Sequence, residues 1–396
     1  PLSLSHALAQ PKTLIRALMG ETQAQPTFWF MRQAGRYLPE YRDLRAKAGD
    51  FLSLCLTPAL AAEVTLQPIR RFGMDAAILF SDILMVPLAL GRELEFRDGE
   101  GPVLEPLDAK ADMPALEARL ASIDRVLEPV YETVTRVAEA LPLDTALIGF
   151  CGAPWTVACY MVDGGSSRDF ARTRRLAYAE PEVFQRLIDV LSEASGRYLE
   201  RQIAAGAEIV QIFDTWAGLL PEDEFRRWCV EPTRRIVAKL RQNHASVPII
   251  AFPRGVGIGY LEMAAETGVD ALGLDPTVPL DWAARMLQGE VALQGNLDPL
   301  LLVVGGVAME QGAARILRAL GRGPFVFNLG HGILPETPPA HVRRLKLPIP
   351  TLLPMRNSCA PLMTTPRSAN RPLPTRAPWA RRYAVLSRHC QRAVPR

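Results

Sequence analysis

The amino-acid sequence predicts an α/β fold, a single (β/α)8 TIM barrel, and two observations support this prediction. Short apolar runs recur along residues 1–345, and each is followed by a segment with helical periodicity. The runs are apolar at successive positions, which is typical of strands that a parallel sheet buries on both faces. Eight such units within ~320 residues suit a barrel. The same alternation also suits a doubly wound sheet, which stays the alternative fold.

Eight segments are expected to form the strands of the barrel, each bounded by turn-forming residues. They are 28–31, 76–80, 146–151, 208–213, 248–252, 271–274, 291–294 and 325–329. The interval between the second and third strands is long, and residues 93–106 have the alternation of a small hairpin around Asp98 and Gly99. We expect this hairpin to be an insertion on the rim of the barrel.

The helices between the strands have recognisable ends. Thr57 followed by Pro58 predicts an N-cap with proline in the first turn, and Gly73 predicts the end of the same helix. Pro181 predicts the start of another helix, which ends near Gly206. Further helices are expected to begin at Pro221, Asp281 and Met309.

The composition is that of a globular protein. The chain has 396 residues, of which 48% are hydrophobic and 22% charged, and this excludes a disordered or collagen-like chain. No apolar run approaches ~18 residues and residues 1–18 lack the apolar core of a signal peptide, so neither a membrane span nor a leader is expected. The six cysteines form no Cys-x-x-Cys pair, which predicts reduced thiols and a cytoplasmic protein.

The last 51 residues differ from the rest of the chain. Residues 346–396 hold one lysine, nine arginines and nine prolines, and they contain no aspartate or glutamate. We therefore predict a barrel over 1–345 and a disordered or non-native extension over 346–396, such as a shifted reading frame would produce. A basic arm for nucleic acid or anionic lipid is the alternative interpretation.

Chemistry in a barrel is carried by residues that follow the carboxyl ends of the strands. Nearly every expected strand is followed by polar residues or a glycine turn, and these are Arg32, Gln33, Gly35, Arg36, Ser81, Asp82, Asp214, Thr215, Trp216, Arg254, Gly255, Asp275, Asn296 and His331. Tyr160 follows the third strand a little later in the chain. The pattern predicts a polar pocket at this end of the barrel.

Arginines are concentrated after the first expected strand. Arg32 and Arg36 are followed by Arg42 and Arg45, and guanidinium groups bind carboxylates or phosphates in bidentate fashion. The cluster predicts a site for a polyanion, although a solvated helix face is the alternative. The apolar residues 28–30 directly upstream favour a buried edge and therefore the site.

Two single residues also stand at strand ends. Asp82 is either a satisfied structural acceptor or a charge directed at a cation or at N–H donors, and His331 lies between two glycines that allow a ligand to approach closely. None of the five histidines is paired with a cysteine or a second histidine at metal-ligand spacing, so no metal site is expected. The glycines at 255, 257 and 259 predict a flexible rim turn rather than a phosphate loop.

The motif MRQAGRYLPEYR at 31–42 closely resembles the N-terminal signature of the uroporphyrinogen decarboxylase family. The resemblance continues, in the family's order, through FSDIL (80–84), GFCGAPWTVACYMVDGGSS (149–167), IFDTWAG (212–218), FPRGVG (252–257), LQGNLDP (293–299) and FNLGHGILPETP (327–338). It spans residues from about 10 to about 345, and it stops where the arginine- and proline-rich segment begins.

The resemblance implies an enzyme that removes carbon dioxide from the four acetate side chains of uroporphyrinogen III and gives coproporphyrinogen III, in porphyrin and haem biosynthesis. It implies no metal or organic cofactor, a homodimer, and no nucleic-acid or membrane partner. Asp82, Arg32 and Arg36 are the implied catalytic residues. The implied substrate-binding residues are Arg32, Gln33, Ala34, Gly35, Arg36, Arg45, Phe51, Asp82, Tyr160, Thr215 and His331.

Elementary chemistry agrees with that activity. A pyrrole protonated at a ring carbon accepts the electron pair that carbon dioxide leaves behind, so no cofactor is required as an electron sink. Asp82 is placed to stabilise the cationic ring, and either Arg32 or Asp82 remains the candidate for proton delivery. A zinc-dependent corrinoid or thiol methyltransferase on a related barrel is one alternative. A tetrapyrrole-binding protein without enzymatic activity is the other.

Overall fold

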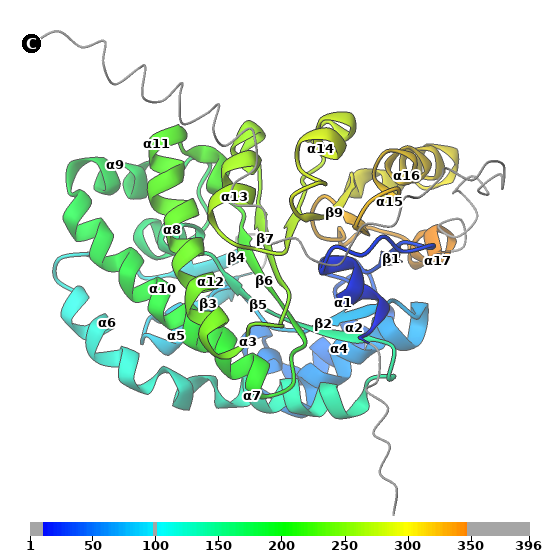
Figure 1. Cartoon of the computed structure of the whole chain (residues 1–396). Coiled ribbons are helices and arrows are strands. Elements are labelled where there is room, and N and C mark those ends of the chain that lie inside the picture. The colour runs from blue at the N-terminus through cyan, green and yellow to red at the C-terminus, as the bar shows by residue number, and fades with distance from the viewer. Residues whose placement is uncertain (1–10, 98–100, 347–396) are drawn as a thin grey trace, which may run out of the picture. The chain divides into compact units, whose positions relative to one another are not determined.

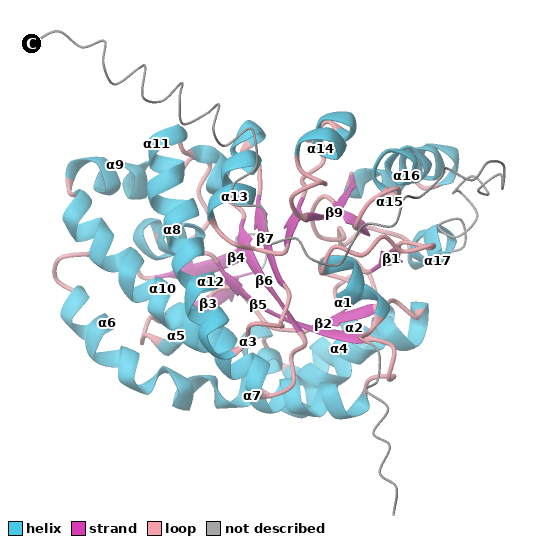
Figure 2. Ribbon diagram, in the orientation of Figure 1, coloured by secondary structure: helices cyan, strands magenta, loops and turns pink. Residues whose placement is uncertain are grey.

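The computed structural model describes residues 11–97 and 101–346, which form one ring of parallel strands inside a layer of helices (Figures 1 and 2). The strands pair in the order β1-β10-β9-β8-β7-β6-β5-β2, and every pair is parallel. Their bounds are β1 Thr27–Phe28, β2 Ala76–Ile78, β5 Ala146–Gly152, β6 Ile209–Asp214, β7 Ile249–Pro253, β8 Ala271–Gly273, β9 Ala292–Leu297 and β10 Phe325–Leu329.

The strand order confirms the barrel and excludes the doubly wound alternative. Each strand lies beside its successor in the chain all the way round, whereas a doubly wound sheet reverses direction at a switch point. Two hydrogen bonds join β2 to β1 where the ladder is interrupted. The N–H of Asp75 donates to the Phe28 carbonyl at 3.0 Å, and the N–H of Phe28 donates to Asp75 Oδ2 at 2.7 Å.

The observed strands match the predicted ones within a few residues, and β1 differs most. It ends at Phe28 rather than at residue 31. The Trp29 N–H still donates to the Phe327 carbonyl at 3.3 Å, but the two N–H groups after it donate to side chains, Phe30 to Gln33 Oε1 and Met31 to Asn328 Oδ1, both at 3.1 Å. These side-chain acceptors replace the strand ladder and allow the chain to turn early at the mouth of the barrel.

The helices return the chain from each strand to the next, and no helix of the described residues is long and apolar enough to cross a membrane. Their bounds are α1 Thr13–Leu18, α2 Pro39–Ala48, α3 Phe51–Cys55, α4 Pro58–Phe72, α5 Met85–Ala89, α6 Met113–Arg119, α7 Ile123–Ala140, α8 Pro154–Asp163, α9 Ala171–Ala179, α10 Pro181–Ala204, α11 Glu222–Phe225, α12 Glu231–Asn243, α13 Tyr260–Glu266, α14 Leu280–Met286, α15 Pro299–Val304, α16 Gly306–Leu320 and α17 Pro339–Lys346.

Most of the predicted helix ends are confirmed. Helix α4 begins at Pro58 and ends before Gly73, which has the left-handed conformation of a C-terminal glycine. Thr57 occupies the N-cap position, but its hydroxyl donates to the Ser53 carbonyl at 2.7 Å instead of capping the helix. The predicted start of α16 at Met309 is wrong, because the helix already begins at Gly306.

The predicted rim hairpin is confirmed by the antiparallel strands β3 (Leu94–Arg97) and β4 (Gly101–Leu104). Its turn at Asp98 and Gly99 lies outside the described residues. The chain divides into two units, Pro1–Leu353 and Pro354–Arg396. The predicted extension over 346–396 lies outside the described residues apart from Lys346, which ends α17.

A buried polar chain crosses the interior of the barrel below its mouth. Trp29 Nε1 donates to Gln294 Oε1 at 2.9 Å, and Gln294 Nε2 donates to Gln211 Oε1 at 3.1 Å. All of these side chains are fully buried. Because their polar groups satisfy one another, the interior of the barrel is packed at this level.

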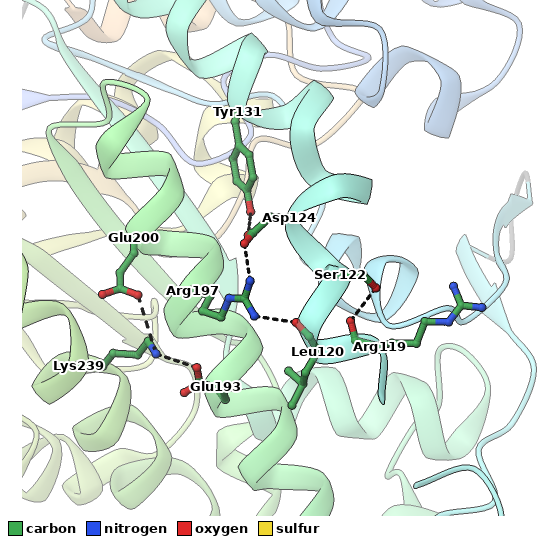
Figure 3. Close-up of polar contacts among 9 residues, drawn as sticks. All are labelled: Arg119, Leu120, Ser122, Asp124, Tyr131, Glu193, Arg197, Glu200 and Lys239. Carbon is green, nitrogen blue, oxygen red and sulfur yellow. Dashed lines mark hydrogen bonds and ion pairs between the residues drawn. The ribbon is translucent and has the colours of Figure 1, made fainter. Parts of the chain in front are cut away.

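On the outside, polar contacts tie α10 to the helices beside it (Figure 3). Arg197 of α10 donates to the Leu120 carbonyl at 2.7 Å and pairs with Asp124 of α7, which also accepts from the Tyr131 hydroxyl at 3.0 Å. Lys239 of α12 pairs with Glu193 of α10 at 2.8 Å. These contacts hold three neighbouring helices of the outer layer in register.

We expect Arg197→Ala to lower the free energy of unfolding by about 1–2 kcal/mol, because it removes an ion pair and leaves Asp124 and Leu120 with fewer donors. The control is Arg136→Ala, whose pair with Glu132 has side chains about half exposed, against 29% and 30% for Arg197 and Asp124. Arg136→Ala should lower the free energy of unfolding by less than about 0.5 kcal/mol. Urea denaturation measures both, and equal values would contradict the expectation.

Candidate active site

A cavity of about 670 Å³ opens at the carboxyl ends of the strands. The sequence-predicted site residues line it with one exception, and the lining residues are Arg32, Ala34, Gly35, Arg36, Arg45, Phe51, Asp82, Tyr160, Thr215 and His331. They follow strands that are far apart in the chain, and the barrel brings them to one place. The prediction of a polar pocket at this end of the barrel is confirmed.

Gln33 is the exception, because it does not line the cavity. Its side chain is fully buried, accepts from the Phe30 N–H and donates to the Ala76 carbonyl at 3.0 Å. Its own carbonyl accepts from the Tyr37 hydroxyl at 2.8 Å. The structure therefore places Gln33 as a brace inside the loop that follows β1.

Arg32 stands at the turn of this loop in an unusual conformation. Its φ of 58° lies in the left-handed region, which is uncommon for a residue with a side chain. The stem of Arg32 lies across Gly332, where an added Cβ would come within 2.6 Å of Arg32 Cγ. The Ile333 N–H donates to the Met31 carbonyl at 2.9 Å and holds the two loops together. Gly332 is thus required for the path of the Arg32 side chain.

Three of the four arginines that line the cavity lack acidic partners among the described residues, and the fourth, Arg97, pairs with Glu95. Arg32, Arg36 and Arg45 form no ion pair with any described residue, and Arg45 donates only to the Gly49 carbonyl at 2.8 Å. Arg42 is exposed, donates to the Arg36 carbonyl at 2.8 Å and does not line the cavity. Uncompensated guanidinium groups around a cavity attract an anion with more than one negative charge.

Asp82 is the one carboxylate among the described residues that line the cavity. The N–H of Leu84 donates to its Oδ1 at 2.9 Å. Burial raises the pKa of Asp82 above its ordinary value, while the Leu84 N–H and the Arg32 charge oppose that rise. Both opposing groups favour the ionised form, which can accept hydrogen bonds from a bound molecule.

His331 is neutral at physiological pH. Burial, together with the positive charges of Arg32 and Arg254, lowers its pKa to about 4. The Gly332 N–H donates to His331 Nδ1 at 2.7 Å, so the proton of the neutral ring is on Nε2. His331 therefore offers an uncharged N–H donor to the cavity.

Tyr160 and Thr215 lie on a wall that a buried network holds in place. The Thr156 hydroxyl donates to Asp214 Oδ1 at 2.6 Å and accepts from the Trp216 N–H at 3.0 Å, which fixes the turn that carries Thr215. The Tyr160 ring packs against that of Trp216, 6.3 Å away between centroids. Burial raises the pKa of Asp214 to about 6.

Among the aromatic residues that line the cavity, the sequence predicts Phe51 and Tyr160 but not five phenylalanines. The cavity is also lined by Phe80, Phe96, Phe150, Phe213 and Phe252. Phe51 connects two of them, with ring centroids 5.7 Å from Phe80 and 4.5 Å from Phe96. A phenylalanine near the carboxyl end of an expected strand could have been predicted to line the cavity. Phe96 and Arg97 come from the hairpin, and nothing in the sequence indicated that they reach the cavity.

Other polar residues at strand ends support the loops. Asp275 is buried and accepts from the Gly255 N–H at 2.8 Å and from the Tyr260 hydroxyl at 3.1 Å. Asn296 Nδ2 donates to the Asp275 carbonyl at 2.9 Å. Over 11–97 and 101–346, no group of three or more His, Cys, Asp or Glu side chains could hold a metal ion. The ligand set that the methyltransferase alternative requires is therefore missing from this part of the chain.

The fold and the site together define a (β/α)8 barrel whose cavity, in the described part of the chain, is lined by four arginines and a single carboxylate. The family model described as uroporphyrinogen decarboxylase (URO-D) matches residues 9–346. The chain belongs to this family, as the sequence motifs predict.

Curated relatives agree with this assignment, and a solved structure shares the fold. The chain is 58% identical over 334 residues to the uroporphyrinogen decarboxylase of Rhodospirillum rubrum, covering 84% of this chain and 95% of the relative. It is 54% identical to the uroporphyrinogen decarboxylase of Brucella canis, over 84% and 97% of the two chains. A methyltransferase from Methanosarcina mazei superimposes with a TM-score of 0.69 at 20% identity, over 85% and 97%, which shows a shared fold.

We expect the imidazole of His331 to titrate near pH 4, and Arg32→Gln to move its pKa upward by removing a neighbouring positive charge. Because the unfolded chain binds this proton near pH 6.5, the histidine makes the protein less stable as the pH falls from about 6.5 to about 4. NMR titration of the histidine ring protons measures the pKa. A value of 6 or more in the unsubstituted protein would contradict the geometry described for this ring.

Proposed function

We propose that the chain decarboxylates uroporphyrinogen III to coproporphyrinogen III, converting each of four acetate side chains to a methyl group. The observation that supports this most strongly is the single carboxylate of the described lining, Asp82, in a cavity where Arg32, Arg36 and Arg45 have no acidic partner among the described residues. Uroporphyrinogen carries eight carboxylates around a ring with four inward N–H groups. A cationic rim with one central acceptor is complementary to that charge distribution.

The reaction needs stabilisation of positive charge and little else from the protein. Protonation of a pyrrole carbon gives a cationic ring, and the C–C bond to the carboxylate then breaks, its electron pair entering the ring. Carbon dioxide leaves, and a proton added at the exocyclic carbon forms the methyl group while the ring proton is lost. The net change is an acetate arm plus one proton giving a methyl arm plus carbon dioxide.

The residues of the cavity have distinct parts in this proposal. Asp82 accepts hydrogen bonds from the pyrrole N–H groups and stabilises the cationic ring as it forms. Arg32, Arg36 and Arg45 hold carboxylate arms, and the neutral His331 donates from Nε2 without adding charge. Tyr160 and Thr215 contact the arms or the edge of the ring from the opposite wall. The phenylalanines pack against the faces of the pyrroles.

The remaining expectations are part of the same proposal. We propose a cytoplasmic homodimer that needs no metal or organic cofactor, and free, buried cysteines at 55, 151, 159 and 229 support the reducing location. Residues 1–345 carry the activity, and 346–396 are dispensable for it. Truncation after residue 345 and sedimentation of the full chain test these two points directly.

Anaerobic incubation with uroporphyrinogen III tests the activity itself. The products are oxidised and separated by their number of carboxylates. Species with seven, six and five carboxylates should appear in turn before the species with four. A protein that leaves the eight-carboxylate compound unchanged, with or without added divalent metal, does not have the proposed function.

Asp82→Asn should lower kcat by about 10²–10³-fold and change the affinity for uroporphyrin by no more than about threefold. The amide keeps the size of the side chain but cannot neutralise a cationic ring. Steady-state kinetics and equilibrium binding of uroporphyrin separate the two effects. A variant that retains more than about half of the wild-type kcat would remove Asp82 from the chemistry.

Gly332→Ala should weaken uroporphyrin binding about tenfold, because the new methyl group takes the space of the Arg32 stem. The matched control is Gly289→Ala, since a Cβ added at Gly289 meets nothing within 4 Å. Fluorescence titration measures both affinities. If the two variants bind uroporphyrin equally well, the packing of Arg32 against Gly332 has no role in binding.

A further inference from the structure

The cations that line the cavity all come from one side of the barrel. Among the described residues, the lining arginines are Arg32, Arg36 and Arg45, from the segment after β1, and Arg97, from the hairpin between β2 and β5. Strands β1 and β2 meet at the seam of the ring. The positive charge of the cavity is therefore concentrated on the half of the mouth next to that seam.

The opposite half of the lining is uncharged. It contains Phe213 and Thr215 at the end of β6 and Phe252 on β7, and no lysine or arginine of the described residues is part of the lining there. His331, after β10, is neutral because its pKa is lowered to about 4. An octa-acid macrocycle carries two carboxylate arms on each of its four rings. Arms directed toward β6 and β7 thus meet no cation in the lining itself.

Arg254 lies just outside the lining on this opposite side. It follows β7, the strand four places from β1 in either direction around the ring, and therefore stands across the mouth from Arg32. Its backbone is fixed to the end of β6. Its N–H donates to the Asp214 carbonyl at 3.0 Å, and its carbonyl accepts from the Gly218 N–H at 3.0 Å.

The guanidinium of Arg254 has no partner in the described part of the protein. It forms no ion pair or side-chain hydrogen bond with residues 11–97 or 101–346, and it is partly exposed. The carboxylate at the end of the next strand, Asp275, is already satisfied by Gly255, Tyr260 and Thr277. An arginine that a fold does not use as an ion pair is available to a ligand.

The charge of Arg254 reaches the cavity. Together with Arg32 it lowers the pKa of His331, a lining residue, so both guanidinium groups act on the same ring. Arg254 is also two residues beyond Phe252, which lines the cavity. Arg254 lies at the mouth of the barrel, its side chain has no partner among the described residues, and its charge acts on a lining residue. All three observations suit a group that binds an anionic ligand.

We propose that Arg254 is a further substrate-binding residue, which holds a carboxylate arm on the side of the mouth opposite Arg32 and Arg36. The inference rests on the proposed function for the identity of the macrocycle. Binding needs guanidinium groups on two facing sides of the cavity mouth, because the carboxylate arms of the substrate point in all directions. Arg254 contacts an arm at the periphery and takes no part in the proton transfer.

Equilibrium titration with uroporphyrin, the oxidised eight-carboxylate ring, tests the proposal without turnover. We expect Arg254→Gln to raise Kd about tenfold and Arg254→Lys to raise it no more than about threefold, since lysine keeps the charge. The matched control is Arg318→Gln. Arg318 is exposed in the last turn of α16, just before β10 begins, at the other end of the barrel. The control should leave Kd unchanged.

Two further measurements separate binding from a structural role. In Arg254→Gln the KM for uroporphyrinogen should rise about tenfold while kcat stays within about threefold, and the effect should shrink at high ionic strength. The pKa of His331 should rise in the same variant, which NMR titration detects. Thermal unfolding should be unchanged, because the fold uses the backbone of Arg254 and not its side chain.

The outcomes distinguish this inference from the proposed function. If the unsubstituted protein produces the four-carboxylate compound and Arg254→Gln binds uroporphyrin as tightly as it does, the inference is overturned and the function stands. Equal loss of binding in Arg254→Gln and Arg254→Lys would also overturn it, since the charge would then be irrelevant. If the unsubstituted protein has no activity but the Kd pattern holds, the proposed function fails and Arg254 remains a carboxylate-binding residue.

Discussion

The site depends on the hydrogen bonds that the buried side-chain amide of Gln33 forms inside the loop after β1. Gln33 accepts from the Phe30 N–H, donates to the Ala76 carbonyl beside β2, and its own carbonyl accepts from Tyr37. These bonds end β1 early and fix a turn that places Arg32 and Arg36 at the mouth. Without such a brace, a loop carrying several like charges would move apart to lower its electrostatic energy.

The charge arrangement of the cavity is unfavourable for the empty protein and favourable for a polyanionic ligand. The like charges of Arg32, Arg36 and Arg45, which have no acidic partner among the described residues, repel one another, and the only carboxylate of the described lining has its pKa raised by burial. A ligand with many carboxylates offsets the repulsion among the arginines. Its cationic centre favours the ionised form of Asp82. The protein therefore meets its substrate with charges already oriented, which is the requirement for stabilising a cation that exists only during the reaction.

The contacts that stabilise the barrel lie apart from the charged residues at its mouth. Below the cavity, Trp29, Gln294 and Gln211 satisfy one another in a packed interior, while Arg197 and Lys239 tie the outer helices together (Figure 3). None of these contacts involves a residue of the cavity. The strained turn at Arg32 and the close approach at Gly332 are held by a scaffold that does not depend on them.

Much of this molecule was determined by the sequence alone. Apolar runs and proline and glycine punctuation predicted the strands, the hairpin and most helix ends, because those signals are local. The ordered motifs predicted the family, and residues directly after strands predicted the polar lining. Tertiary structure decided what depends on distant neighbours: Gln33 braces a loop, Asp275 is occupied by its neighbours, and phenylalanines from separate strands share one wall. Whether a side chain faces a cavity or a neighbour depends on how the ring closes, and residues far apart in the chain fix that closure.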